Sequence, residues 1–222
     1  VLVLAGDTLD FSLQQYSCSF EEGQSFFSTL ASEDLFDEIV FIAGNHDHNV
    51  WQMVQKETAV IDRLRKGEIP REFAHIRGAL IDLEAGELVI PNVTNVPEAS
   101  DSDSFFIQGI FGKEALKRPK FWVVYPNLFI QPPISTSAKA EPILVTHGHF
   151  FSLPWVLLTS VFPQNLQINN NFTLEQLEQI NSPLTEMAWT ALGQAGVLTD
   201  VARNIYSSTA KGETEVLQRV IE

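Results

Sequence analysis

Three short apolar runs end abruptly in polar residues, and this pattern organises the rest of the sequence. Residues 1–5, 39–43 and 143–146 are rich in β-branched and other apolar side chains, which predicts buried strands. The residues that follow are Gly-Asp, Gly-Asn-His-Asp-His and His-Gly-His, respectively. Because open α/β sheets bind ligands where their strands end, we expect the three segments to build one site.

Segments with helical periodicity separate these strands. Residues 20–36 and 50–66 carry apolar side chains at helical spacing, and Gly67 supplies a stop for the second helix. The first strand, the first helix and the second strand form a βαβ unit, so the two strands should be parallel neighbours. This topology brings Asp7 and Asn45 to the same edge of the sheet.

The rest of the chain is less regular. Residues 80–83 and 87–90 predict a hairpin, whereas 121–125 and 128–131 predict two further strands. The apolar patch at residues 105–111 is interpreted as core. Helical patterns predict further helices near residues 174–180, 187–192 and 197–205. The fold class predicted by this order of elements is α/β.

Net charge, the length of the apolar runs and the number of cysteines disfavour several classes of protein. The 222 residues include 28 acidic and 14 basic side chains, which gives a net charge of −14 and disfavours binding to nucleic acid or anionic membranes. No apolar run is long enough to span a bilayer. The single cysteine, Cys18, excludes an internal disulfide and is typical of a reducing compartment, so we predict a cytoplasmic location.

The polar residues at the strand ends are candidates for a metal centre. Asp7, Asn45 and His147 offer a carboxylate, an amide oxygen and an imidazole, a mixed set that suits Mn, Fe or Zn better than Mg or Ca. His46 is a candidate to donate a proton to a leaving oxygen or to stabilise charge on phosphate. Asp47 is a second candidate catalytic residue, which would orient His46; alternatively it would hold the turn.

Three further polar residues lie close to these motifs in the sequence. Asp10 follows Asp7 by three residues and is a candidate to support the ligands or to shape the turn. His48 and His149 are expected near the site without being ligands themselves.

The three motifs resemble those of the calcineurin-like metallophosphoesterases. Gly-Asp-Thr-Leu-Asp at residues 6–10, Gly-Asn-His-Asp at 44–47 and Thr-His-Gly-His at 146–149 are similar to three successive blocks of that family. The resemblance implies a four-layer α/β/β/α sandwich whose two divalent metal ions hydrolyse phosphate esters with a metal-bound hydroxide. It also implies that Asp7 bridges the metals, that Asn45 and His147 bind the second metal, and that His46 is catalytic.

Two blocks of the family pattern are missing. Neither an opening Asp-x-His nor a closing Gly-His-x-His is present, unless His147 and His149 are themselves the closing pair. We therefore expect residues 1–222 to be a single metallophosphoesterase domain without its first strand and helix and without its C-terminal block. Residues 50–140 and 150–222 exceed what a compact member needs, and we expect them to contain insertions for a cap or for dimerisation.

Two functions from different classes follow from these observations. The first is hydrolysis of a phosphorylated small molecule, either a phosphomonoester or a phosphodiester, with a second copy of the chain as a candidate partner. The second is a catalytically inactive scaffold that uses the same fold for protein contacts, because the outer metal-binding blocks are absent. A nuclease is disfavoured by the net charge of −14.

Overall fold

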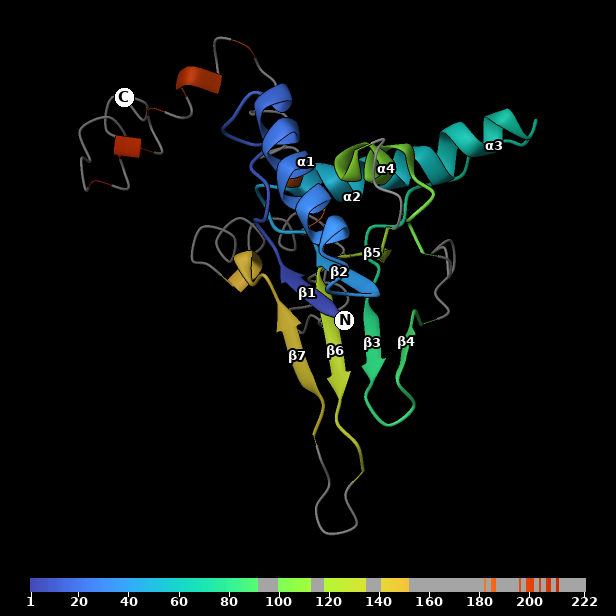
Figure 1. Cartoon of the computed structure of the whole chain (residues 1–222). Coiled ribbons are helices and arrows are strands. Elements are labelled where there is room, and N and C mark those ends of the chain that lie inside the picture. The colour runs from blue at the N-terminus through green and yellow to red at the C-terminus, as the bar shows by residue number, and fades with distance from the viewer. Residues whose placement is uncertain are drawn as a thin grey trace, which may run out of the picture.

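A computed structural model describes residues 1–91, 100–112, 118–134 and 141–151, together with scattered positions between 182 and 211. The described chain is a mixed α/β structure, with its helices gathered above the strands in Figure 1. The strands are β1 (Leu2–Ala5), β2 (Glu38–Ile42), β3 (Ala79–Asp82), β4 (Glu87–Val89), β5 (Lys120–Val124), β6 (Asn127–Gln131) and β7 (Ile143–Thr146). The helices are α1 (Tyr16–Ser32), α2 (His48–Lys56), α3 (Asp62–Arg65) and α4 (Phe105–Phe111), with a π-helical turn at Glu57–Ile61 and a 3₁₀ turn at His149–Phe151.

The strands of the described chain form two sheets. The first has the order β1-β2-β5 and is parallel throughout, which confirms the βαβ unit predicted for the first two strands. Ala5 is level with Ile42, and Ile42 with Val124, so these strands end at the same edge. The second sheet has the order β4-β3-β6-β7 and contains the predicted hairpin of β3 and β4.

Alternate residues of the first sheet face two different cores. Ile39 and Phe41 of β2 pack with apolar residues of α1, α2 and α4, whereas Val40 and Ile42 pack against the second sheet. Helices, first sheet and second sheet are therefore three successive layers of the described residues. The helices predicted at 174–180 and 187–192 lie outside the described residues, and 197–205 is described only at scattered positions.

Two predicted helices differ from those in the structure. The first begins at Tyr16 and ends at Ser32, so Leu35 lies outside it and is 61% exposed. Asp34 adopts a positive φ of 49°, a left-handed conformation that an α-helix does not continue through. The second predicted helix is present over most of its length, but Ile61 and Leu64 are exposed instead of buried.

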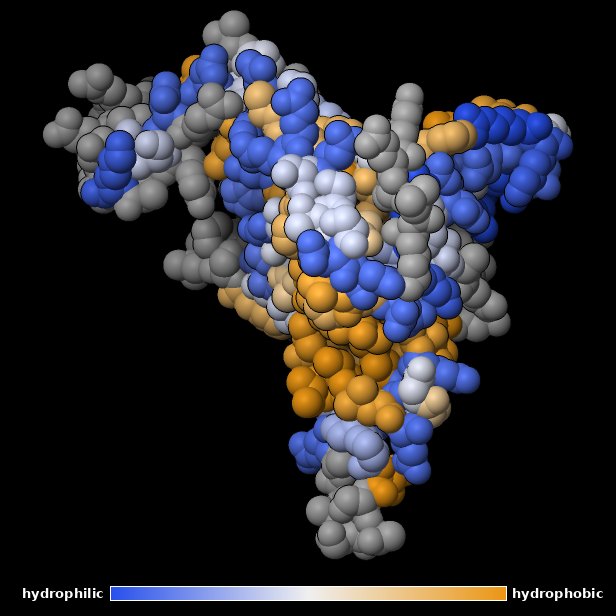
Figure 2. All heavy atoms as spheres, in the orientation of Figure 1, coloured by the Kyte–Doolittle hydropathy of each residue, from blue (hydrophilic) through white to orange (hydrophobic). Residues whose placement is uncertain are grey.

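Only one of the three apolar strands is buried as predicted. Strand β2 lies between two neighbours, whereas β1 and β7 each have one strand partner among the described residues. Ile143 and Leu144 of β7 are 55% and 41% exposed, and Val1 before β1 is also exposed. Figure 2 shows hydrophobic atoms gathered on the surface around these strands. The prediction of buried strands was wrong for β1 and β7 because both lie at sheet edges.

No helix in the described ranges combines the length and the apolar character needed to cross a membrane.

Candidate metal centre

Two glycines allow the strand-end loops to approach one another closely. A Cβ atom at Gly6 would collide with the imidazole of His147, and one at Gly44 would collide with Asp7. Gly6 has a φ of 87°, and Asp7 itself has a φ of 49°, which a non-glycine residue rarely adopts. The backbone turn after β1 thus accepts strain in order to place the Asp7 carboxylate beside the loops after β2 and β7.

The side chains of Asp7, Asn45 and His147 converge as predicted. The Nε2 atom of His147 lies 3.2 Å from Oδ2 of Asp7 and 3.1 Å from Oδ1 of Asn45. The three residues follow β1, β2 and β7, so both sheets contribute to the cluster. The structure therefore brings the ends of the three predicted segments together, as the sequence predicts.

The hydrogen bond at Nδ1 of His147 determines the tautomer of its ring, and so whether Nε2 can accept. Its Nδ1 atom lies 3.3 Å from the carbonyl oxygen of Ala5, which can only accept, so Nδ1 carries a hydrogen. In the neutral imidazole, Nε2 then presents a lone pair toward Oδ2 of Asp7 and Oδ1 of Asn45. Three acceptor atoms that face one another require a cation between them, either a proton on Nε2 or a metal ion.

The spacing of these atoms fits a metal ion. Ligand atoms about 2.1 Å from one divalent ion are separated by about 3.0 Å when they subtend a right angle at the ion and by about 3.4 Å at the tetrahedral angle. The distances of 3.1 and 3.2 Å from His147 to Asn45 and Asp7 lie between these two values. When a proton takes this place instead, the hydrogen bond to Asp7 raises the pKa of His147 in spite of its partial burial. The donor set therefore suits a borderline divalent cation.

The described residues supply ligands for one ion only. Within the ranges that the structure describes, no three His, Cys, Asp or Glu side chains gather around a common point, and the third ligand here is the amide of Asn45. The predicted pair of ions would need additional ligands from outside these ranges. Asp7 is the residue available to bridge to a second ion.

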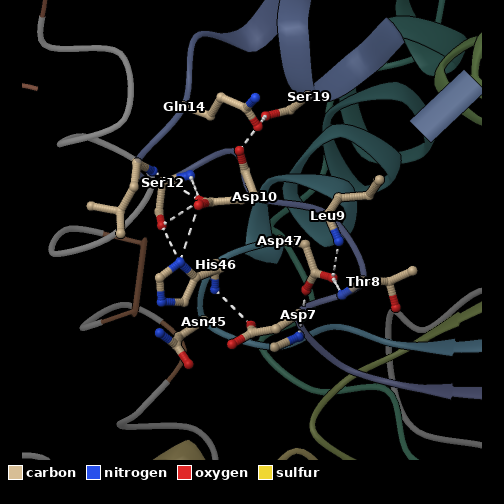
Figure 3. Close-up of polar contacts among 12 residues, drawn as sticks. Asp7, Thr8, Leu9, Asp10, Ser12, Gln14, Ser19, Asn45, His46 and Asp47 are labelled. Carbon is tan, nitrogen blue, oxygen red and sulfur yellow. Dashed lines mark hydrogen bonds and ion pairs between the residues drawn. The ribbon is translucent and has the colours of Figure 1, made fainter. Parts of the chain in front are cut away.

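His46 lies beside this cluster and is held by three residues of the loop after β1 (Figure 3). Its backbone N–H donates to Oδ1 of Asp7 at 2.9 Å, while its Nδ1 atom lies 2.7 Å from Oγ of Ser12 and 3.3 Å from Oδ1 of Asp10. Burial alone would lower the pKa of His46, but the contact with Asp10 and the charge of Asp7 raise it. Burial also opposes ionisation of Asp10, yet hydrogen bonds from His46 and Leu13 lower its pKa to about 2.

Asp47 fastens the loops together. Its Oδ1 atom accepts from the backbone N–H of Gly44 at 2.6 Å, and its Oδ2 atom accepts from those of Thr8 at 2.8 Å and Leu9 at 3.3 Å. The side chain is fully buried, and burial raises its pKa to about 7 despite these three donors. Of the two roles predicted for Asp47, the hydrogen bonds support holding the turn.

His48 and His149 lie in a second cluster around Tyr125. The ring of His48 is fully buried and lies edge-on to Tyr125, with ring centroids 4.7 Å apart. The Nε2 atom of His149 lies 3.3 Å from both the hydroxyl of Tyr125 and that of Thr185. Burial and mutual repulsion among the histidines lower the pKa of His48 to about 3 and that of His149 to about 4. The ring of His149 still lies 5.5 Å from that of His147, so the two clusters adjoin.

Two partners in these clusters were missed from the sequence. Ser12 lies in a loop, where serine is common, so its identity gives no signal. Its position two residues after Asp10 does give one, because an aspartate side chain often accepts from the backbone N–H two residues later. Tyr125 directly follows the buried strand β5, and its pattern in the sequence does not distinguish it from its core neighbours.

No protein-family model, curated protein or solved structure matches the chain.

Proposed function

We propose that the chain belongs to a metal-dependent phosphoesterase of the calcineurin-like type, with a four-layer α/β/β/α sandwich and a binuclear centre. The observation that carries the proposal is the convergence of Asp7 Oδ2, Asn45 Oδ1 and His147 Nε2 from three strand ends, with separations of 3.1 and 3.2 Å. The two described sheets and the helices on one of them are consistent with three of the four layers.

The proposed reaction divides its tasks between the metal and the chain. A metal ion bound here would supply Lewis-acid chemistry, which activates water and offsets the charge of the phosphate. Asp7, Asn45 and His147 would hold it in place. His46 donates the proton on Nε2 to the oxygen of the leaving alcohol as the phosphorus–oxygen bond breaks and a bond from phosphorus to the water oxygen forms. The attacking water gives up one proton to solvent, and His46 regains a proton from solvent once the alcohol has left.

Phosphorylated small molecules are the substrates that best fit the charge of the protein. A net charge of −14 repels a polyanion such as nucleic acid over its whole length, whereas a small phosphate ester meets only the metal centre. Phosphomonoesters and phosphodiesters both present the phosphoryl oxygens that a metal ion polarises.

The experiment is an assay of the purified chain with Mn²⁺ or Zn²⁺ on p-nitrophenyl phosphate and bis-p-nitrophenyl phosphate. We expect Asn45→Ala and His147→Ala to lose metal and activity together. His46→Asn should retain metal while kcat falls by about 10²–10⁴-fold, the usual contribution of a general acid. His75→Ala, at an exposed histidine, is the control and should behave like the wild type.

Two outcomes would contradict the proposal. Full activity in His46→Asn would remove the assigned proton donor. A folded chain that binds metal and hydrolyses neither ester would favour the inactive scaffold instead.

A further inference from the structure

The hydroxyl of Ser12 lies between Asp10 and His46. Ser12 is 1% exposed, and its Oγ atom lies 2.7 Å from Nδ1 of His46 and 3.0 Å from Oδ1 of Asp10. Figure 3 shows these three side chains pointing toward one another from the loops after β1 and β2. The hydroxyl of Ser12 lies closer to Nδ1 of His46 than Oδ1 of Asp10 does, since the latter is 3.3 Å away.

The carboxylate of Asp10 is already engaged by other donors. Its Oδ1 atom accepts from the backbone N–H groups of Ser12 at 3.1 Å and Leu13 at 2.9 Å, and from the hydroxyl of Ser12 at 3.0 Å. A carboxylate oxygen offers about two lone-pair directions, and three donors at these distances occupy them. A fourth donor at 3.3 Å is therefore held less tightly by Asp10 than by Ser12, whose hydroxyl lies 2.7 Å from the same Nδ1 atom.

The chemistry of the donors fixes the direction of both hydrogen bonds. An ionised carboxylate only accepts, so the single hydrogen on Oγ of Ser12 points to Asp10. The serine oxygen then has only lone pairs left for His46, and the hydrogen in that contact lies on Nδ1. His46 is held with Nδ1–H donating to Ser12, so that Nε2 is the ring atom that gains and loses a proton.

Backbone hydrogen bonds near Ser12 hold its hydroxyl beside the imidazole of His46. The N–H of Phe11 donates to the carbonyl of His46 at 3.0 Å, and the side chain of Asp47 ties Thr8 and Leu9 to the loop of His46. Ser12 thus stands on a segment that is joined to the imidazole at both the backbone and the side chain. A rotation of the His46 ring would break the short contact to Ser12.

We propose that Ser12 is the positioning residue of His46: its hydroxyl accepts the Nδ1 hydrogen, fixes the tautomer and the orientation of the imidazole, and connects it to Asp10. The effect on hydrolysis rests on the function proposed above, whereas the tautomer does not. Asp10 also lies near the imidazole, but the distances assign the positioning contact to Ser12.

The direct test is long-range ¹H–¹⁵N NMR of the His46 ring in ¹⁵N-histidine-labelled protein, at a pH where the imidazole is neutral. We expect the wild type to show one tautomer with the hydrogen on Nδ1. Ser12→Ala should shift His46 toward the Nε2–H tautomer or a mixture, and Ser12→Thr, which keeps a hydroxyl, should restore the wild-type spectrum. Ser28→Ala, an exposed serine on α1, is the matched control.

The NMR result separates this inference from the proposed function. An Nε2–H tautomer in the wild type, or an unchanged ring spectrum in Ser12→Ala, would overturn the role of Ser12 whatever the protein hydrolyses. The wild-type spectrum is informative even if Ser12→Ala does not fold.

Kinetics provide the second readout. If p-nitrophenyl phosphate is a substrate, we expect Ser12→Ala to lower kcat by about tenfold or more with little change in KM, because ground-state binding does not use Ser12. Metal content should stay the same. A fall in metal content together with kcat would show a structural role instead of positioning. If neither ester is hydrolysed by the wild type, the proposed function fails while the tautomer assignment stands.

Discussion

Each of the two histidine motifs contributes one residue to each of two different environments. His46 and His147 lie among carboxylates at the strand ends, and their pKa values are raised. His48 and His149, two residues further along, lie buried around Tyr125, and their pKa values are lowered. The same side chain, twice repeated at the same spacing, is thus placed in opposite electrostatic surroundings.

The difference shows that each loop supplies one histidine for the polar site and one for the packing behind it. The first pair contacts Asp7, Asp10 or the hydroxyl of Ser12 and stays half-buried, so it can exchange protons or bind a cation. The second pair is buried around Tyr125 and fills the space behind the site. Asp47 supports a member of each pair, because it stands between His46 and His48 and joins their loop to the loop after β1.

The largest effect is expected from Asp47→Ala, which removes the support shared by both pairs. Three backbone N–H groups would lose their acceptor, those of Gly44 and Leu9, which are buried, and that of Thr8, which is partly buried. Since each buried donor left unpaired costs about 1–3 kcal/mol, the free energy of unfolding should fall by about 3 kcal/mol or more. Chemical denaturation measures it, with the exposed Glu21→Ala as control. Wild-type stability with loss of activity would instead support the catalytic role predicted for Asp47.

A smaller effect on folding, confined to the first pair, is expected from Gly6→Ala. Gly6 and Gly86 have φ angles of 87° and 71°, so alanine at either position should cost about 1 kcal/mol of stability through backbone strain. Only at Gly6 would the new Cβ collide with His147, because Gly86 has open space around it. We expect Gly6→Ala to weaken Mn²⁺ or Zn²⁺ binding by tenfold or more in calorimetric titration, whereas Gly86→Ala binds normally. Equal affinity in the two variants would refute the close approach of Gly6 and His147.

The smallest effect at neutral pH is expected from His48→Phe, which alters only the buried pair. Neither ring nitrogen of His48 has a hydrogen-bond partner among the described residues, so phenylalanine should pack against Tyr125 with little change in stability at pH 7. The difference should emerge in acid. The folded pKa of about 3 lies below the unfolded value of 6.5, so protons bind the unfolded chain preferentially between these values and stability falls as pH decreases from about 6.5 toward 3.

The pH dependence of unfolding measures this effect. Protonation of His48 in the unfolded chain should lower the free energy of unfolding of the wild type by about 2 kcal/mol at pH 5, at 1.36 kcal/mol per pH unit. The His48→Phe variant should not show this loss. His149 remains in the variant and continues to titrate with a folded pKa of about 4. A variant as acid-sensitive as the wild type would mean that His48 is not held neutral by burial.

The convergence of the site could be predicted from the sequence because it depends on a general property of sheets. Parallel neighbours end at the same edge, so Asp7 and Asn45 had to meet once the βαβ unit was recognised. The exposure of β1 and β7 could not be predicted in this way, since an apolar run looks the same at the centre and at the edge of a sheet. Ser12 was missed because its role depends on the position of a loop 34 residues away in sequence.

The central claim is that Asp7, Asn45 and His147 form a metal centre, and elemental analysis of the purified chain tests it most directly. We predict at least one Mn, Fe or Zn per chain, lost in Asn45→Ala and His147→Ala and kept in His48→Phe. A folded wild-type chain without metal, or variants that retain the full wild-type content, would contradict the account.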